Sequence, residues 1–180
     1  MRAATHIAGG ILAAELLMLK KCPDPSETQL TVILGSAIFG SIAPDIDSVD
    51  SKISNSGLFA KILGAVTEKK EGHRGKLHTP FFCIIVAAIL YFALPFLANY
   101  LPINIVWGRL AVMAAAAGYL SHLALDLFNP GGIMLYSPFS RKHYHLGMIK
   151  TYSLGDWLVC IFLAAAATYL AVRMGIILWQ

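Results

Sequence analysis

The chain has 180 residues, of which 57% are hydrophobic and only 13% are charged, and its mean hydropathy is +0.67. A soluble domain carries about a quarter charged residues, so this composition excludes an ordinary soluble globular protein and indicates a lipid bilayer as the solvent. The net charge of +4 is small and dispersed, and no nucleic-acid-binding motif accompanies it, so no nucleic-acid partner is expected.

The first apolar stretch runs from Ala3 to Leu19 and follows Arg2, which is the usual beginning of a cleavable signal peptide. Lys20 and Lys21 come directly after it, in place of the small residues that a signal peptidase requires. We therefore expect the segment to be retained as a helix.

Four further apolar stretches follow, at Leu30 to Ala43, Phe81 to Leu101, Ile105 to Phe128 and Leu154 to Leu178. The last three reach the roughly 20 residues with which a helix crosses a bilayer. The stretch 30–43 is shorter, but Gly35 and Gly40 permit the close packing of a buried or tilted span. The sequence thus predicts an all-α fold, a polytopic membrane bundle of about five apolar helices that forms one integral membrane domain over residues 1–180.

Two long connections, 48–79 and 129–153, carry most of the positive charge. Together with Arg2 they place ten of the fourteen Lys and Arg residues on one side of a five-span arrangement. The positive-inside rule therefore predicts a cytoplasmic amino terminus and two cytoplasmic connections. Apolar side chains at helical spacing over 54–65 predict a short interfacial helix in the first connection.

The most informative polar residues are His122 and Asp126, which interrupt the apolar run from Leu110 to Phe128. A separation of four residues places both side chains on one face of a helix. Ionisable groups within a membrane cost a few kcal/mol each, so a facing pair predicts a functional site, most simply a metal site. The competing interpretation is a buried histidine that is hydrogen-bonded to the neighbouring aspartate without any metal.

The five-span arrangement brings further ligand-type residues to the same membrane face, because each lies at the corresponding end of a span. Four helix ends would then supply imidazoles and carboxylates to one polar layer, as a zinc or manganese site with several ions requires. The predicted metal ligands are His6, Asp45, Asp47, His73, His78, His122 and Asp126.

Two of the contributing motifs have simpler explanations. The segment Pro44-Asp45-Ile46-Asp47 supplies two carboxylates, but it is equally typical of a polar helix end. The segment 73–80 combines two histidines with basic residues, so Arg74 and Thr79 are candidates for binding a phosphate-bearing substrate. A basic loop attracted to anionic headgroups would explain its lysines, but not its histidines.

Other polar residues have weaker claims. His143 and His145 alternate in a basic loop and are expected to be solvated. Asp156 is a further residue that could line the site, as are Tyr136 and Ser137. Glu15, within the first stretch, is either a deeper functional group or a polar contact between helices.

The ordered motifs resemble those of the YdjM-like inner-membrane proteins of bacteria, which are described as LexA-regulated, metal-dependent hydrolases. The resemblance covers nearly the whole chain and implies a membrane-bound hydrolase, whereas regulation by LexA would be a property of the promoter. It rests on Thr5-His6, the segment 40–47, His73-Arg74-Gly75 with His78-Thr79, and the segment 118–122 with Asp126.

A more distant similarity is to the zinc-dependent phospholipase C and P1-type nuclease group. It implies that the zinc ligands are Asp45, His73 or His78, His122 and Asp126. The chain departs from that pattern because no further histidine closely follows Asp126, so the similarity does not fix the number of metal ions.

The leading hypothesis is that metal-activated water attacks a phosphoester or a lipid-like substrate, with membrane lipid as the natural partner. Arg74 would hold the phosphate, and Asp47 or Asp45 would act as general base. A transporter or channel is the first alternative, but it would place charged residues near the midplane of several spans. A structural membrane protein whose histidines and aspartates pack helix ends is the second.

Overall fold

The computed structural model of the chain describes residues 1–22, 24–47, 77–100 and 104–176. Within these ranges the regular elements are helices; residues 128–153 form a loop, in which Ile133 and Tyr144 make one isolated antiparallel pairing. The helices are α1 (Ala3–Lys21), α2 (Glu27–Ile42), the 3-10 helix η1 (Ala43–Asp47), α4 (Pro80–Leu97), α5 (Ile105–Leu127) and α6 (Leu154–Arg173). An all-helical membrane bundle, as predicted, is confirmed.

The elements begin close to the predicted residues because local signals fix their ends. Ser26 and Gln29 form a reciprocal capping box, so α2 begins three residues before the predicted Leu30. Thr79 caps α4, and Pro80 occupies the first turn, where its missing N–H costs nothing. The predicted interfacial helix over 54–65 lies outside the described residues.

Two helices end earlier than the apolar stretches that predicted them. α4 stops at Leu97, four residues before Leu101, and Asn99 and Tyr100 follow in single turns. α6 stops at Arg173, and Gly175 takes a φ of +70°, a conformation that glycine adopts without steric cost. Hydropathy alone therefore overestimates both lengths, because it does not register turn-forming residues.

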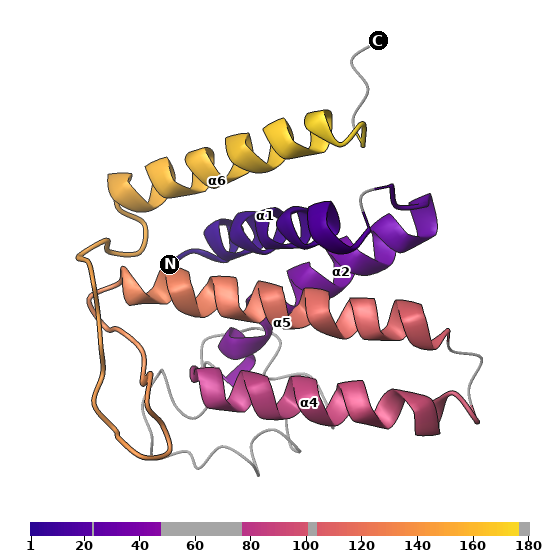
Figure 1. Cartoon of the computed structure of the whole chain (residues 1–180). Coiled ribbons are helices and arrows are strands. Elements are labelled where there is room, and N and C mark those ends of the chain that lie inside the picture. Colours follow the sequence, from indigo (N-terminus) through magenta and orange to yellow (C-terminus); the bar gives the residue numbers. More distant parts are fainter. Residues whose placement is uncertain (23, 48–76, 101–103, 177–180) are drawn as a thin grey trace.

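Figure 1 shows the helices arranged side by side in alternating directions, with α5 at the centre of the bundle. α5 contacts α1, α2 and α4, while α1 also contacts α2 and α6. α1, α4, α5 and α6 are each long and apolar enough to cross a membrane. α2 has 16 residues and packs against α1 and α5, which agrees with the predicted short span held by its neighbours.

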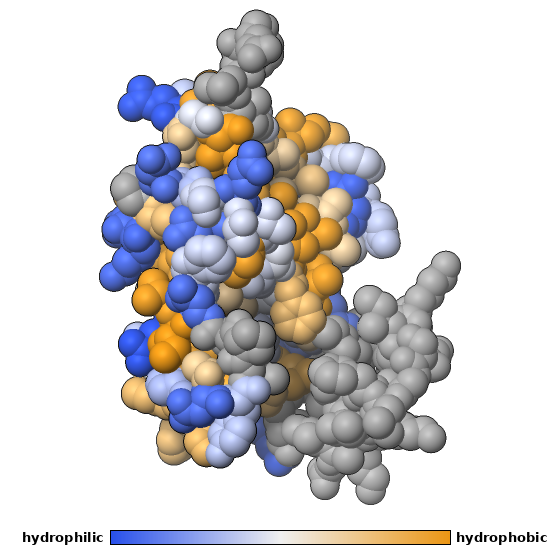
Figure 2. Space-filling view, turned by 90° about the vertical axis from the view of Figure 1, so that its right-hand side faces the viewer, coloured by the Kyte–Doolittle hydropathy of each residue, from blue (hydrophilic) through white to orange (hydrophobic). Residues whose placement is uncertain are grey.

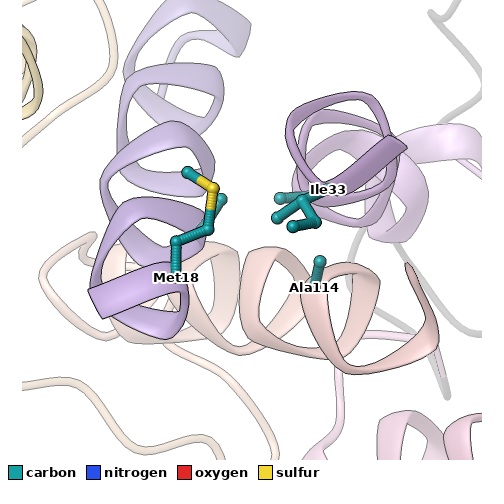
Figure 3. Close-up of a cluster of buried hydrophobic side chains, with 5 residues drawn as sticks. Met18, Ile33 and Ala114 are labelled. Carbon is teal, nitrogen blue, oxygen red and sulfur yellow. The ribbon is translucent and has the colours of Figure 1, made fainter. Parts of the chain in front are cut away.

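The main core lies where α1, α2 and α5 meet. Met18, Ile33 and Ala114 point toward one another there, and Ala14 and Ala37 complete the buried cluster (Figure 3). Large apolar side chains on the outer faces of α4 and α6 remain exposed, among them Phe92 and Phe162. An aqueous solvent would oppose such exposure, so these faces are suited to contact with lipid.

The crossing of α2 and α5 is unusually close because glycines face backbone across it. A Cβ atom at Gly118 would collide with the carbonyl oxygen of Ala37, and one at Gly40 would collide with that of Ala115. Only glycine permits this approach, as in other membrane helix pairs that meet through small residues. The crossing lies one residue before Ser41 and one turn before His122.

Figure 2 looks onto the end of the bundle away from the amino terminus. This view shows hydrophilic and hydrophobic side chains side by side on the described surface. The polar cluster that the sequence predicts lies at the opposite end, where α1, α4 and α6 begin and α5 ends.

Candidate metal centre

Five of the predicted ligands converge at that end of the bundle, although they are up to 120 positions apart in the chain. They arrive from the first turns of α1, from η1, from the residue two positions before α4, and from the last turns of α5. The five residues are His6, Asp45, His78, His122 and Asp126. We call them the His/Asp cluster.

His122 lies at the centre of the His/Asp cluster. Its Nδ1 atom lies 2.7 Å from the carbonyl oxygen of Ser41, and a carbonyl can only accept a hydrogen bond, so Nδ1 carries the proton. In the neutral form of the ring, Nε2 is then the atom that carries the lone pair. Nε2 is buried, and it has no hydrogen-bond partner among the described residues. A backbone carbonyl that fixes the ring in this way is the usual outer support of a metal-binding histidine.

Pro44 reduces the competition for the Ser41 carbonyl that contacts His122. In a continuing helix, the N–H groups three and four positions later would compete for this carbonyl. Residue 44 is a proline and has no N–H, so the donor three positions after Ser41 is missing. Pro44, two residues after the end of α2, therefore removes one of the two N–H groups that could compete with His122 for this carbonyl.

The carboxylates lie on the lone-pair side of His122. Its Nε2 is 3.5 Å from Oδ2 of Asp126 and 3.7 Å from Oδ1 of Asp45. The His6 ring stacks on the His122 ring with centroids 3.7 Å apart, and His6 Nε2 lies 3.7 Å from Asp126 Oδ1. His78 Nε2 lies 3.2 Å from Asp45 Oδ1 and 4.0 Å from Asp126 Oδ2. Imidazoles and carboxylates thus alternate around one small space.

The His/Asp cluster is closed on most sides and open at one. The side chains of His6, His78, His122 and Asp126 are at most 2% exposed, whereas that of Asp45 is 41% exposed. Burial raises the pKa of the Asp45 carboxyl, but its hydrogen bond with His78 and the nearby His122 and His6 imidazoles outweigh this effect. Its pKa therefore lies below the ordinary value, and Asp45 is an ionised group at the mouth of the site.

The geometry offers two overlapping sets of three ligand atoms, each within 4.8 Å of one another. One set is His6, Asp45 and His122, and the other is His78, His122 and Asp126. Because Nδ1 of His122 is committed to Ser41, only Nε2 remains, and the two sets share it. A nitrogen lone pair binds one ion, so His122 cannot serve both sets at once.

The residues fit a divalent cation on chemical grounds. Two carboxylates and three imidazoles are the nitrogen and oxygen donors that zinc prefers, and two negative charges balance one divalent ion. The amino group of Met1 lies 3.2 Å from Asp126 Oδ1, so a positive charge already contacts this carboxylate. The unpaired Nδ1 atoms of His6 and His78 are also buried.

The segment before α4 is held in place by α5. The hydroxyl of Tyr119 donates a hydrogen bond to the carbonyl oxygen of Leu77, next to His78. Thr79, a predicted substrate contact, is buried, and its hydroxyl accepts a hydrogen bond from the N–H of Phe82 at the start of α4. That bond caps the helix, and a role of Thr79 in substrate binding stays a prediction.

The other predicted site residues have different outcomes. His73, Arg74 and the side chain of Asp47 lie outside the described residues, so their predicted roles stay predictions. His143 and His145 are exposed in the loop after α5, as expected for solvated residues. Tyr136 is also exposed and packs against Tyr144 rather than in the cluster. Glu15 is buried in α1, more than two turns from His6.

Asp156 was a weak candidate for the site, and the structure assigns it to the support of α1. It accepts hydrogen bonds from the Thr5 hydroxyl at 2.7 Å, from Nε of Arg2 at 3.0 Å and from the N–H of Tyr152 at 3.0 Å. The Arg2 guanidinium also lies 3.5 Å above the Trp157 ring. Asp156 therefore ties the start of α6 to the turn of α1 that carries His6.

Replacing Asp156 by alanine is expected to lower the free energy of unfolding by about 2 kcal/mol, because buried hydrogen bonds to a charged group are lost. Hydrogen exchange at the first turn of α1 should accelerate in the same variant. Thr151→Ala is the control, since it removes only the Asn129 contact within the loop. Equal exchange in Asp156→Ala and the wild type would contradict this assignment.

Sequence reasoning missed three supports of the cluster: the Ser41 carbonyl, the Tyr119 hydroxyl and the pair of Arg2 and Thr5 with Asp156. For the Ser41 carbonyl, the available sequence signals were Gly40 and Gly118, because glycines in two apolar helices indicate that the two backbones approach closely. No sequence signal pairs Asp156 with residues 151 and 154 positions away.

Comparison with known proteins supports a membrane identity. Two proteins of Bacillus subtilis (strain 168), both described as uncharacterized, are similar to this chain. YfhP is 29% identical over 175 residues, which cover 95% of this chain and 47% of YfhP, so the chain spans about half the length of that relative. YvsG is 29% identical over 169 residues, covering 94% of this chain and 93% of YvsG.

No solved structure matches the chain. The distant similarity to phospholipase C and P1-type nucleases therefore stays a prediction. The family model described as YdjM inner membrane protein matches residues 1–179. The four apolar helices agree with this match and with a membrane-embedded protein. The chain thus belongs to the YdjM inner membrane protein family.

Proposed function

We propose that this protein is a membrane-bound, metal-dependent hydrolase that acts on a phosphoester or lipid-like substrate. The observation that carries the proposal is the buried Nε2 of His122, which faces two carboxylates and has no hydrogen-bond partner among the described residues. Leaving such an atom unpaired costs about 1–3 kcal/mol, and a cation between the imidazoles and carboxylates removes that cost.

Zinc is the proposed metal, with manganese as the alternative, because imidazole and carboxylate donors suit both ions. His6, Asp45, His78, His122 and Asp126 would hold it, joined by Asp47 and His73 if the predicted set is complete. A bound divalent metal lowers the pKa of water toward about 7 and stabilises the charge that develops on the attacked group.

The remaining roles belong to the protein. The general base is proposed to be the carboxylate of Asp45 or Asp47 that does not bind the metal. It accepts the proton that water loses as the water oxygen forms a bond to phosphorus, and Asp45 is suited to this role because it is ionised and partly exposed. The bond from phosphorus to the leaving alcohol breaks, and the alcohol oxygen takes up the proton that the carboxylate accepted from water. Arg74 and Thr79 are proposed to bind the phosphate oxygens.

The proposed orientation places the amino terminus, the His/Asp cluster and both long connections on the cytoplasmic side of the inner membrane. The distribution of Lys and Arg supports the cytoplasmic side. The position of the described helix ends in Figure 1 supports only that the starts of α1, α4 and α6 and the end of α5 lie on the same side. In this orientation the site would lie at the level of the lipid headgroups. A substrate that carries a phosphoester in that layer would reach Asp45 without leaving the membrane.

Metal content and hydrolysis, measured together, test the proposal. We expect detergent-purified protein to retain about one equivalent of zinc or manganese by elemental analysis and to hydrolyse members of a phosphoester and phospholipid panel. Asp126→Asn keeps the side-chain size but removes a charged ligand, so both signals should fall more than tenfold.

Asp24→Asn is the matched control, because Asp24 lies between α1 and α2 at the other end of the bundle. A wild-type protein without retained metal that gains none on addition of zinc or manganese would overturn the metal site. Full metal occupancy with no hydrolysis of any panel member would reject the hydrolase and favour a structural metal centre.

A transporter is less well supported by the described residues. The His/Asp cluster is confined to one end of the bundle, whereas transport sites lie near the midplane. Glu15 is the buried acidic residue at a deeper position in α1.

A further inference from the structure

The loop between α5 and α6, residues 129–153, has an unusual charge pattern. From Asp126 to Asp156 the sequence contains no intervening acidic residue, but it contains Arg141, Lys142 and Lys150, all of them exposed. Positive charge is typical of the cytoplasmic connections of membrane proteins, and Lys and Arg beside a membrane span are attracted to the anionic lipids of that leaflet. We call residues 129–153 the basic loop.

Large apolar side chains are exposed in the same loop as these cations. Phe139 is 88% exposed, Tyr152 79%, Leu146 74% and Met148 73%. Exposed apolar and basic side chains in one short segment are typical of segments that lie at a membrane interface, where the apolar groups enter the boundary of the acyl chains and the cations meet phosphate.

This exposure is built into a folded loop. Ile133 and Tyr144 exchange two backbone hydrogen bonds of 3.0 and 2.9 Å. The N–H of Leu146 donates to the carbonyl oxygen of Leu127 at 2.7 Å, and that of Ile149 donates to Phe128 at 2.9 Å. Because the backbone is fixed by these bonds and Ile133 is buried, the apolar side chains are held outward.

The basic loop continues into surfaces suited to lipid. The Phe139 ring packs edge-on against that of Phe81 at the start of α4, with centroids 6.4 Å apart. At its other end the loop joins α6, where Leu154 and Trp157 are exposed. Both helices are long and apolar enough to cross a membrane, so the boundary of the bilayer must pass near the loop.

We propose that the basic loop lies in the headgroup layer of the membrane and binds anionic phospholipid through Arg141, Lys142 and Lys150. Its apolar side chains anchor the loop at the depth of the acyl-chain boundary, and its cations select negatively charged headgroups. The proposal does not depend on the metal site or on hydrolase activity, because none of these three cations belongs to the His/Asp cluster.

The test is the lipid preference of the full chain in phosphatidylcholine bilayers. Spin-labelled phosphatidylglycerol and spin-labelled phosphatidylcholine are compared by the fraction of label that the protein immobilises. We expect wild-type protein to prefer phosphatidylglycerol, and added salt to weaken the preference. The triple variant Arg141→Gln, Lys142→Gln, Lys150→Gln should bring the ratio of the two fractions to about one.

The matched control removes the same number of charges from the other end of the bundle, as Lys20→Gln, Lys21→Gln, Arg173→Gln. It should keep the wild-type preference. A second variant, Lys142→Gln with Lys150→Gln, retains Arg141 and should lose part of the preference. The proposal is overturned if the folded loop variants keep the full preference for phosphatidylglycerol, or if the control variant loses as much of that preference as the triple variant. The basic loop would then bind a different partner, such as an acidic protein.

Discussion

Replacing Gly118 by leucine is expected to separate α2 from α5 and to abolish the folded bundle at ordinary temperatures. Even a Cβ atom at this position would collide with the carbonyl oxygen of Ala37, which belongs to a helix backbone and cannot rotate away. Overpacking of a well-packed core costs about 1–3 kcal/mol, and a leucine against backbone lies beyond that range. Thermal unfolding in detergent and the yield of monodisperse protein measure the effect.

The milder Gly118→Ala is expected to preserve the fold but to damage the His/Asp cluster. It pushes the helices apart at the level of Ala37, one turn from Ser41, so the 2.7 Å contact between the Ser41 carbonyl and His122 Nδ1 should lengthen. Gly35→Ala is the matched control, since a Cβ there meets nothing within 4 Å. It should be neutral or stabilising by up to about 1 kcal/mol. If Gly118→Ala and Gly35→Ala had equal effects on stability and on the His/Asp cluster, the close crossing of α2 and α5 would be contradicted.

Zinc added to chelator-treated protein is expected to raise its stability strongly, because an ion that binds only the folded state shifts the unfolding equilibrium. At a thousandfold excess of free metal over the dissociation constant, the gain is about 4 kcal/mol. His122→Ala should abolish this gain, since it removes the one ligand that both sets of three share. The measurement is the unfolding temperature with and without metal.

His143→Ala controls for surface binding of metal, because His143 is exposed in the basic loop and lies outside the His/Asp cluster. Its stabilisation by zinc should equal that of the wild type. His122→Ala also loses the bond to Ser41, so its metal-free stability should fall as well. The decisive quantity is therefore the change in unfolding temperature that metal produces. If this change is as large in His122→Ala as in the wild type, the His/Asp cluster is not the metal site.

The helices were predictable because a bilayer demands long apolar segments, and few other sequence patterns produce them. The meeting of His6, Asp45, His78 and the α5 pair was predictable for a related reason. Spans that alternate in direction bring every second helix end to the same side, so residues at those ends need no long-range information to be placed together. Figure 1 displays this alternation for the described helices.

The supports of the cluster were not predictable, because they depend on distances between particular backbone and side-chain atoms. Ser41 contributes a carbonyl, a group that every residue has, so its identity carries no signal. Asp156 was grouped with possible site residues, but its carboxylate is occupied by Arg2, Thr5 and the Tyr152 N–H. Sequence patterns show which residue types are rare in a membrane, and only the fold shows which are already paired.

The hydrogen bond between the Ser41 carbonyl and His122 also implies when, during synthesis of the chain, the metal site becomes complete. The ring acquires its fixed proton position only when α2 and α5 are in contact, and α5 is made long after α2 during synthesis. His6 and Asp45 enter the membrane earlier, without the residue that both ligand sets share. An ion held as we propose is therefore fully coordinated only after α5 has been made, because the amino-terminal half lacks the ligand that both sets share.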